Sequence, residues 1–189
     1  MISTYLQKNC WKAYGKLIRS RPTPDEDEIA FVDDGTCDER NLRCYLSGTE
    51  WNRIENGEVE GTRGYLLCFK PFGFIYYMPR FMIHILDTLE GLTDETDLDL
   101  TVDFLDILDC GDEPKPLPIG NSSPGKIRKL KRGAKMYHWR LHRVDDIRSF
   151  MTGDQIECVL KFLKYCTQAH SDYCSFDHAY SHYWHQSDD

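Results

Sequence analysis

The chain has 189 residues, of which 31 are Asp or Glu and 23 are Lys or Arg, so its formal net charge at pH 7 is −8. This length predicts one domain. Hydrophobic residues make up 41% and aromatic residues 13%, which excludes a largely disordered chain and a coiled coil. The acidic balance argues against nonspecific binding of nucleic acid or anionic lipid by the whole surface.

The N-terminus and the cysteines indicate the compartment. The first twenty residues, MISTYLQKNCWKAYGKLIRS, lack the apolar core that a signal peptide needs. The most apolar stretch, residues 72–92, is interrupted by Arg80, Asp87 and Glu90, so it is too charged to cross a bilayer. Eight cysteines without a secretory signal indicate reduced thiols. We therefore expect a cytoplasmic protein that does not contact membranes.

Helical periodicity dominates the N-terminal half. Apolar residues recur at helical spacing over residues 3–19, and an acidic connector follows at 25–39. A short helix is expected over 39–46, where Ser47-Gly48 provides the stop. A weaker helical stretch, interrupted by two glycines, covers 58–69.

The strongest helical signal follows Pro71, which suits a first helical turn. Residues 72–89 are apolar nearly all round and should form the central core helix, which Pro79 should kink or split. Residues 97–109 predict another helix, with one apolar face of Leu98, Val102, Leu105 and Leu108 and an opposite face of Asp99, Asp103 and Asp106.

The C-terminal half begins with a Pro/Gly/Ser-rich loop at 111–125. Alternating residues near 135–142 predict a short β segment. Thr152 and Gln155 have capping-box spacing and should begin an apolar helix that reaches Cys166. The sequence thus predicts a mainly α, single helical domain over 1–169, with an inserted Pro/Gly-rich and basic segment at 111–146. A loosely structured His/Tyr-rich tail should follow at 170–189.

Three segments carry a resemblance: DDGTCDERNLRCYLSGTEW, LLCFKPFGFIYYMPRFMIHILDTL and FMTGDQIECVLKFLKYC. Together they resemble an uncharacterised bacterial domain-of-unknown-function family. Its members combine a Phe-x-Pro-x-Gly-Phe-x-Tyr-Tyr-x-Pro core helix with a Thr-x-x-Gln-capped C-terminal helix. The resemblance covers most of residues 25–109 and 148–168. It implies a mostly helical domain with no established activity, and it leaves the function open.

The region from Asp87 to Glu113 contains many carboxylates and no Lys or Arg. Such a run is most often a solvated helix face, but it is also suited to steering a basic partner. By analogy with acidic immunity proteins, which cover basic catalytic clefts, the first hypothesis is a non-enzymatic protein-binding module that neutralises a basic toxin or effector. The expected partner-binding residues are Asp94, Glu95, Asp99, Asp103 and Asp106.

The basic segment 126–143 provides an alternative. It interleaves cations with aromatic side chains, a combination that can follow a phosphate backbone and stack on bases. In a nucleic-acid-associated protein the binding residues would be Lys129, Lys131, Arg132, Trp139 and Arg140. The competing interpretation is that this segment pairs with the acidic face of the same chain. We favour it, because the chain is acidic and shows no nucleic-acid fold signature.

Metal and catalytic chemistry have weaker support. Cys166, His170, Cys174, His178 and His182 recur every four residues, a series that suits zinc only if one helix carries them all. We expect no metal and no cofactor. No P-loop, Rossmann glycine fingerprint, Gly-x-Ser-x-Gly or His-Glu-x-x-His motif occurs. An enzyme of unknown type remains a further alternative, and the sequence does not predict the oligomeric state.

Overall fold

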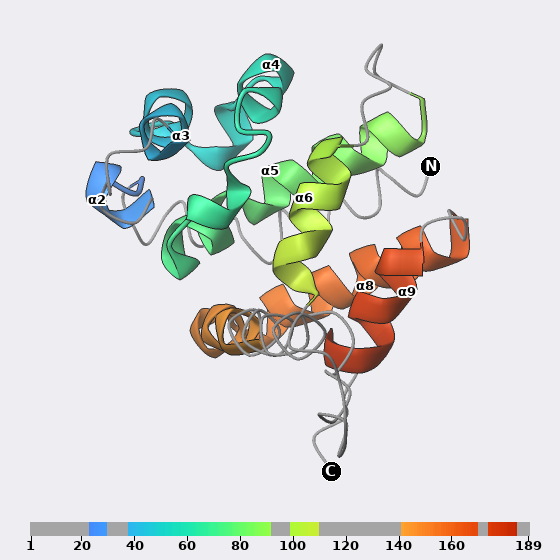
Figure 1. The fold of residues 1–189 in the computed structure, drawn as a ribbon. Helices are drawn as coiled ribbons and strands as arrows, with labels where there is room; N and C mark the ends of the chain where they lie inside the picture. Colours follow the sequence, from blue (N-terminus) through green and yellow to red (C-terminus); the bar gives the residue numbers. More distant parts are fainter. Residues whose placement is uncertain (1–22, 30–37, 92–98, 110–140, 170–173, 185–189) are drawn as a thin grey trace, which may run out of the picture.

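The computed structural model describes residues 23–29, 38–91, 99–109, 141–169 and 174–184. Every regular element within these ranges is helical, which confirms a mainly α fold (Figure 1). The predicted helix at 3–19 and the loop at 111–125 lie outside the described residues.

One group of helices comprises residues 23–109. Its elements are α2 (Glu26–Ile29), α3 (Asp38–Leu46), the 3-10 turn η1 (Trp51–Arg53), α4 (Asn56–Glu60), the 3-10 turn η2 (Leu66–Cys68), α5 (Pro71–Leu89) and α6 (Asp99–Leu108). The predicted helices at 39–46, 72–89 and 97–109 are therefore present as α3, α5 and α6. The weak helical stretch at 58–69 becomes two short elements, the end of α4 and η2.

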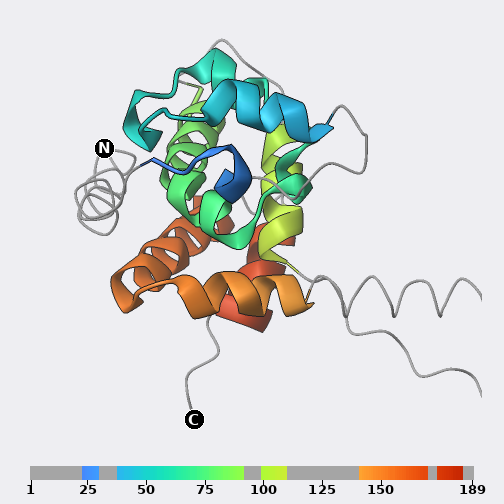
Figure 2. The same cartoon turned by 90° about the vertical axis from the view of Figure 1, so that its left-hand side faces the viewer.

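The second group comprises residues 141–184. Residues 141–150 are helical, and α8 (Gly153–Ala169), α9 (Cys174–Ala179) and the π-helical turn η3 (Tyr180–Trp184) follow. Figures 1 and 2 show this group packed beneath α5 and α6. At the junction, α6 contacts α9.

Two expectations for this second group are corrected. At Leu141 and His142, the described residues of the predicted β segment near 135–142, the chain is helical. The tail is not loose over residues 174–184, because Phe176, Ala179 and Trp184 are buried. An alternating pattern over as few residues as 135–142 does not distinguish a strand from a helical segment.

The central helix α5 continues through Pro79, so the expectation that this proline splits the helix is wrong. Pro71 occupies the first turn, where its missing N–H costs nothing. Residues from Gly73 to Leu86 are buried on most sides of the helix. Packing from all directions holds the helix together at Pro79, although the proline removes one backbone hydrogen bond.

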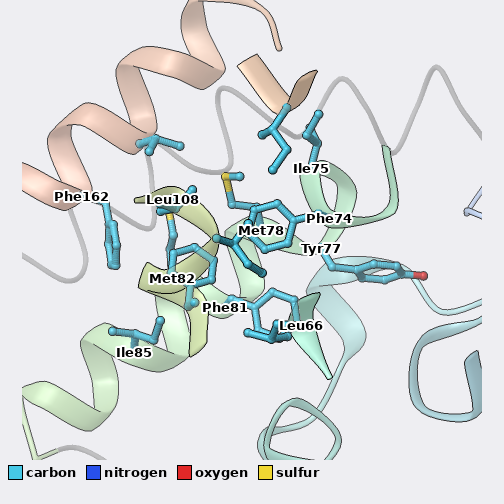
Figure 3. Packing of buried hydrophobic residues seen from close by; sticks show 14 of the residues in the cluster. Leu66, Phe74, Ile75, Tyr77, Met78, Phe81, Met82, Ile85, Leu108 and Phe162 are labelled. Carbon is cyan, nitrogen blue, oxygen red and sulfur yellow. The ribbon is translucent and has the colours of Figure 1, made fainter. Parts of the chain in front are cut away.

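A run of aromatic rings connects the two groups of helices. Phe74 and Phe81 of α5 both contact Phe104 of α6, with ring centroids 5.6 and 6.1 Å apart. Phe104 in turn contacts Phe162 of α8 at 5.9 Å, and Phe162 contacts Phe176 of α9 at 6.1 Å. Figure 3 shows Phe162 facing the α5 side chains across this interface.

Tyr77 extends the core toward α3. Its ring is buried, and its hydroxyl points away from the apolar cluster (Figure 3). The hydroxyl donates to the carbonyl of Leu46 at 2.6 Å, at the C-terminal end of α3. Burial raises the pKa of this hydroxyl, so Tyr77 remains a neutral donor at physiological pH.

The start of α8 has the predicted capping box. The backbone N–H of Thr152 donates to Gln155 Oε1 at 2.8 Å, and the N–H of Gln155 lies 3.4 Å from Thr152 Oγ1. These two bonds satisfy backbone donors that the helix itself leaves free.

Gly73 sets how closely α2 approaches α5. A Cβ at this position would lie 2.8 Å from both the Cα and the carbonyl oxygen of Ile29. Because those atoms belong to backbone, we expect Gly73→Ala to lower the free energy of unfolding by about 1–3 kcal/mol. The matched control is Gly57→Ala, whose added Cβ meets no atom within 4 Å; we expect equal or slightly higher stability. Urea denaturation of both variants checks this, and equal loss would contradict the close-packing explanation.

Trp184 is the main anchor of the C-terminal turns. It is 1% exposed, and its Nε1–H donates to the Leu108 carbonyl at 3.0 Å. We expect Trp184→Ala to cost about 3–5 kcal/mol by thermal or urea denaturation. Phe150→Ala is the control, because Phe150 is 66% exposed and its loss should change stability by less than about 0.5 kcal/mol.

Candidate functional site

The expected acidic binding residues are only partly described. Asp94 and Glu95 lie outside the described residues, as does the side chain of Asp99, which begins α6. Asp103 and Asp106 are half-buried on α6. The structure therefore places two of the five predicted side chains on one helix.

The outward surface of α6 also exposes an apolar side chain. Val102 is 53% exposed, whereas Leu100, Phe104, Leu105 and Leu108 on the same helix are buried. The expectation that Val102 shares the apolar face with Leu105 and Leu108 is therefore wrong. In the helix register, positions 99 and 106 lie one turn before and one turn after Val102. We call Val102 and the aspartates at 99, 103 and 106 the acidic α6 face.

A second exposed apolar residue lies on a neighbouring element. Leu67 of η2 is 37% exposed, and η2 contacts α6. Their connection includes Asp103, whose Oδ2 accepts a hydrogen bond from the backbone N–H of Gly64 at 2.6 Å. Gly64 has φ +79°, a conformation that favours glycine. Asp103 therefore fixes the turn before η2 in addition to contributing charge to the α6 face.

All five basic and aromatic residues expected to bind nucleic acid lie outside the described residues: Lys129, Lys131, Arg132, Trp139 and Arg140. Arg143, at the end of the basic segment, is described and is not a surface cation. It is 8% exposed and donates to the carbonyls of Leu67 at 2.8 Å, Phe69 at 3.0 Å and Leu66 at 3.4 Å.

Burial lowers the pKa of Arg143 to about 10, against a smaller opposing effect of Cys68. The guanidinium thus remains charged at neutral pH and binds carbonyl oxygens at the end of η2, of which the Leu66 carbonyl also accepts the Phe69 backbone N–H. The sequence analysis missed this role, because a basic run gives no sign of which cation is buried.

The C-terminal Cys/His series is not gathered into one site by the described residues. Cys166 is buried in α8, and burial raises the pKa of its thiol. His178 of α9 instead pairs with Asp109, with Nδ1 and Oδ1 2.8 Å apart. The side chains of His170, Cys174 and His182 lie outside the described part. Within the described ranges, no three His, Cys, Asp or Glu side chains form a group suited to a metal ion.

The four cysteines with described side chains, Cys44, Cys68, Cys158 and Cys166, are free thiols. Cys158 lies in the core, as its apolar surroundings in the sequence predict. Tyr165, next to Cys166, donates to Glu90 at 2.8 Å, and burial together with this bond raises its pKa to about 12.

A polar cluster around the buried His84 joins α4 to α5. It consists of Asn56 and Glu60 from α4 and Arg80 and His84 from α5. His84 is 1% exposed; its Nε2 lies 2.5 Å from Glu60 Oε1, and its Nδ1 lies 3.2 Å from Asn56 Oδ1. The sequence analysis missed this cluster, although Arg80 and His84, two polar residues one turn apart within the apolar stretch of α5, were the available signal.

Within the described ranges, no helix combines the length and apolar character needed to cross a bilayer. Comparison with models of protein families gives no match, and neither curated proteins nor solved structures match the chain. The resemblance to a bacterial domain-of-unknown-function family therefore stays a prediction.

Substitution of Arg143 tests whether this arginine stabilises the fold or acts as a surface cation. Arg143→Met leaves three carbonyls without their charged donor, so we expect a loss of at least about 2 kcal/mol in the free energy of unfolding. The control is Arg53→Met, since the Arg53 side chain is 73% exposed and pairs with Glu50 at 2.9 Å; its loss should cost less than about 1 kcal/mol. Equal urea midpoints for both variants would contradict the buried role of Arg143.

Proposed function

We propose that this protein is a cytoplasmic protein-binding module of the immunity type, which neutralises a basic toxin or effector by docking it on the acidic α6 face. The observation that carries the proposal is Val102, an exposed valine on a helix whose neighbouring positions are aspartates. An apolar centre with a polar rim is the usual composition of a protein interface.

Charge supports a basic partner. The whole chain carries −8, and residues 87–113 contain no Lys or Arg. In the described ranges Asp and Glu also outnumber Lys and Arg. A one-sided field of this kind raises the rate of association with a positively charged protein and discourages acidic partners.

The arrangement of α6 also supports docking on this helix. Its inner side is fixed by Phe104, which contacts rings on α5 and α8. The Asp103 side chain accepts a hydrogen bond from the Gly64 backbone N–H, which connects α6 to the turn before η2. A rigid helix loses little conformational entropy when a partner binds. A small exposed patch on it can therefore contribute more to the binding free energy than the same patch on a flexible segment.

Each part of the α6 face has a matched control. Tagged full-length protein is used to capture its partner from native cells, and the purified pair is then titrated by calorimetry. We expect Val102→Ser to weaken binding about tenfold, which corresponds to about 1.4 kcal/mol. Phe150→Ser removes an apolar side chain that is more exposed than Val102 from another helix and should leave affinity unchanged.

The charge contribution is tested by Asp106→Asn, with Asp145→Asn on the helix 141–150 as control. We expect the Asp106 variant to bind more weakly and with a smaller dependence on salt, because it lacks one rim charge. The proposal fails if the captured partner is not basic, or if neither Val102→Ser nor Asp106→Asn changes affinity. Capture of nucleic acid, released by salt and lost on deletion of residues 126–140, would instead support the alternative function.

A further inference from the structure

The polar cluster of Asn56, Glu60, Arg80 and His84 is the connection between α4 and the middle of α5. Arg80 donates from Nε to the Ile54 carbonyl at 2.7 Å and from its terminal nitrogen to Asn56 Oδ1. His84 sits one turn further along α5, and both of its ring nitrogens lie against oxygen atoms of α4. The directions of the hydrogen bonds within this cluster follow from the chemistry of its members.

The donor and acceptor of each hydrogen bond can be assigned by starting from Arg80, because a guanidinium group donates hydrogen bonds and never accepts them. The Asn56 atom that faces Arg80 must therefore be the amide oxygen. That same oxygen lies 3.2 Å from His84 Nδ1, so Nδ1 must carry a hydrogen. The orientation of the Asn56 amide is fixed by its charged neighbour.

The second ring nitrogen faces a carboxylate. His84 Nε2 lies 2.5 Å from Glu60 Oε1, and the Glu60 side chain is 19% exposed. Carboxylate oxygens only accept hydrogen bonds, so the donor of this contact is the ring nitrogen. Nε2 must then carry a hydrogen too. We infer that His84 is a buried imidazolium that fastens α4 to α5, and that its proton serves as a latch between these two helices.

The surrounding charges are compatible with a positive ring. On α5 itself the near charges are Arg80 and Asp87, and α4 adds Glu58 and Glu60. Both Asp87 and Glu58 act on Arg80, which stays cationic although burial lowers its pKa. The exposed cation of η1, Arg53, is paired with Glu50 at 2.9 Å.

The other elements packed on α5 bring further carboxylates. The exposed acidic residues of α2 lie at the N-terminal end of α5, where Gly73 meets Ile29. On α6, Asp103 faces Gly64. The charges around the latch thus include more carboxylates than cations, and they oppose loss of the ring proton.

Removal of the proton would leave one ring lone pair facing an oxygen atom at close range. A buried acceptor opposite another acceptor is unfavourable, since neither gains a hydrogen bond and water is excluded. The contact between α4 and α5 should therefore weaken as pH rises, and α4 should separate from α5 before the core helices do.

The first test needs no substitution. We expect the ring nitrogens of His84 in the full chain, observed by nitrogen-detected NMR at neutral pH, both to carry hydrogen. Exposed His142 on the helix 141–150 provides a reference that exchanges freely with solvent. A neutral ring, with one nitrogen bare, would overturn the inference.

The second test uses Glu60→Gln, which keeps the side-chain shape and removes the charge. We expect His84 to lose its second ring hydrogen at neutral pH in this variant. Glu157→Gln is the control, because Glu157 pairs with Lys161 on the surface of α8, and it should leave the ring doubly protonated. Retention of both ring hydrogens in Glu60→Gln would overturn the pairing.

Stability provides the third readout. A folded state that keeps its proton where an unfolded histidine, with an ordinary pKa of about 6.5, has lost it becomes less stable as pH rises. The stability advantage of wild type over Glu60→Gln should thus be complete below the unfolded pKa of about 6.5 and should shrink as pH rises above it. An advantage that grows over this range would contradict the latch.

Discussion

The contact of Phe104 with the rings of α5 and α8 is the interaction on which the fold depends. Without it, residues 23–109 and 141–184 would each present a half-covered apolar surface. Edge and tilted contacts, 5.6 to 6.1 Å between centroids, run from Phe74 and Phe81 through Phe104 to Phe162. Such ring pairs add directional preference to the burial of apolar area, so they fix the angles between helices as well as their separation.

The position of Phe104 explains why α6 is both a core element and a candidate binding element. The same ten-residue helix places Phe104 in the core and Val102 at the surface. Asp103, between them, bonds the turn at Gly64. The charges of α6 are therefore not equivalent: Asp103 and Asp109 each have an internal partner, and position 106 flanks the exposed valine.

Sequence periodicity predicted α3, α5, α6 and the capped α8, because an apolar stripe and a cap are local features. It allowed Pro79 to kink or split α5; the split does not occur, because α5 continues through Pro79 among buried residues. It did not detect the roles of Arg143, Trp184 and His84. Each of these residues bonds to atoms 24 to 77 positions away, and no local pattern contains such a partner. For the acidic α6 face, the sequence predicted the charges but not the exposure of Val102.

The bonds made by Arg143 close a very long segment of chain, because its three carbonyl acceptors lie 74 to 77 positions earlier. Bringing the ends of such a segment together lowers the conformational entropy of the chain, and this loss occurs before the bonds form. Folding of this protein should thus be slower than its helical content suggests, since rates follow the sequence separation of contacts. Once formed, the same bonds make η2 and the helix 141–150 parts of one cooperative unit, which opens to hydrogen exchange together.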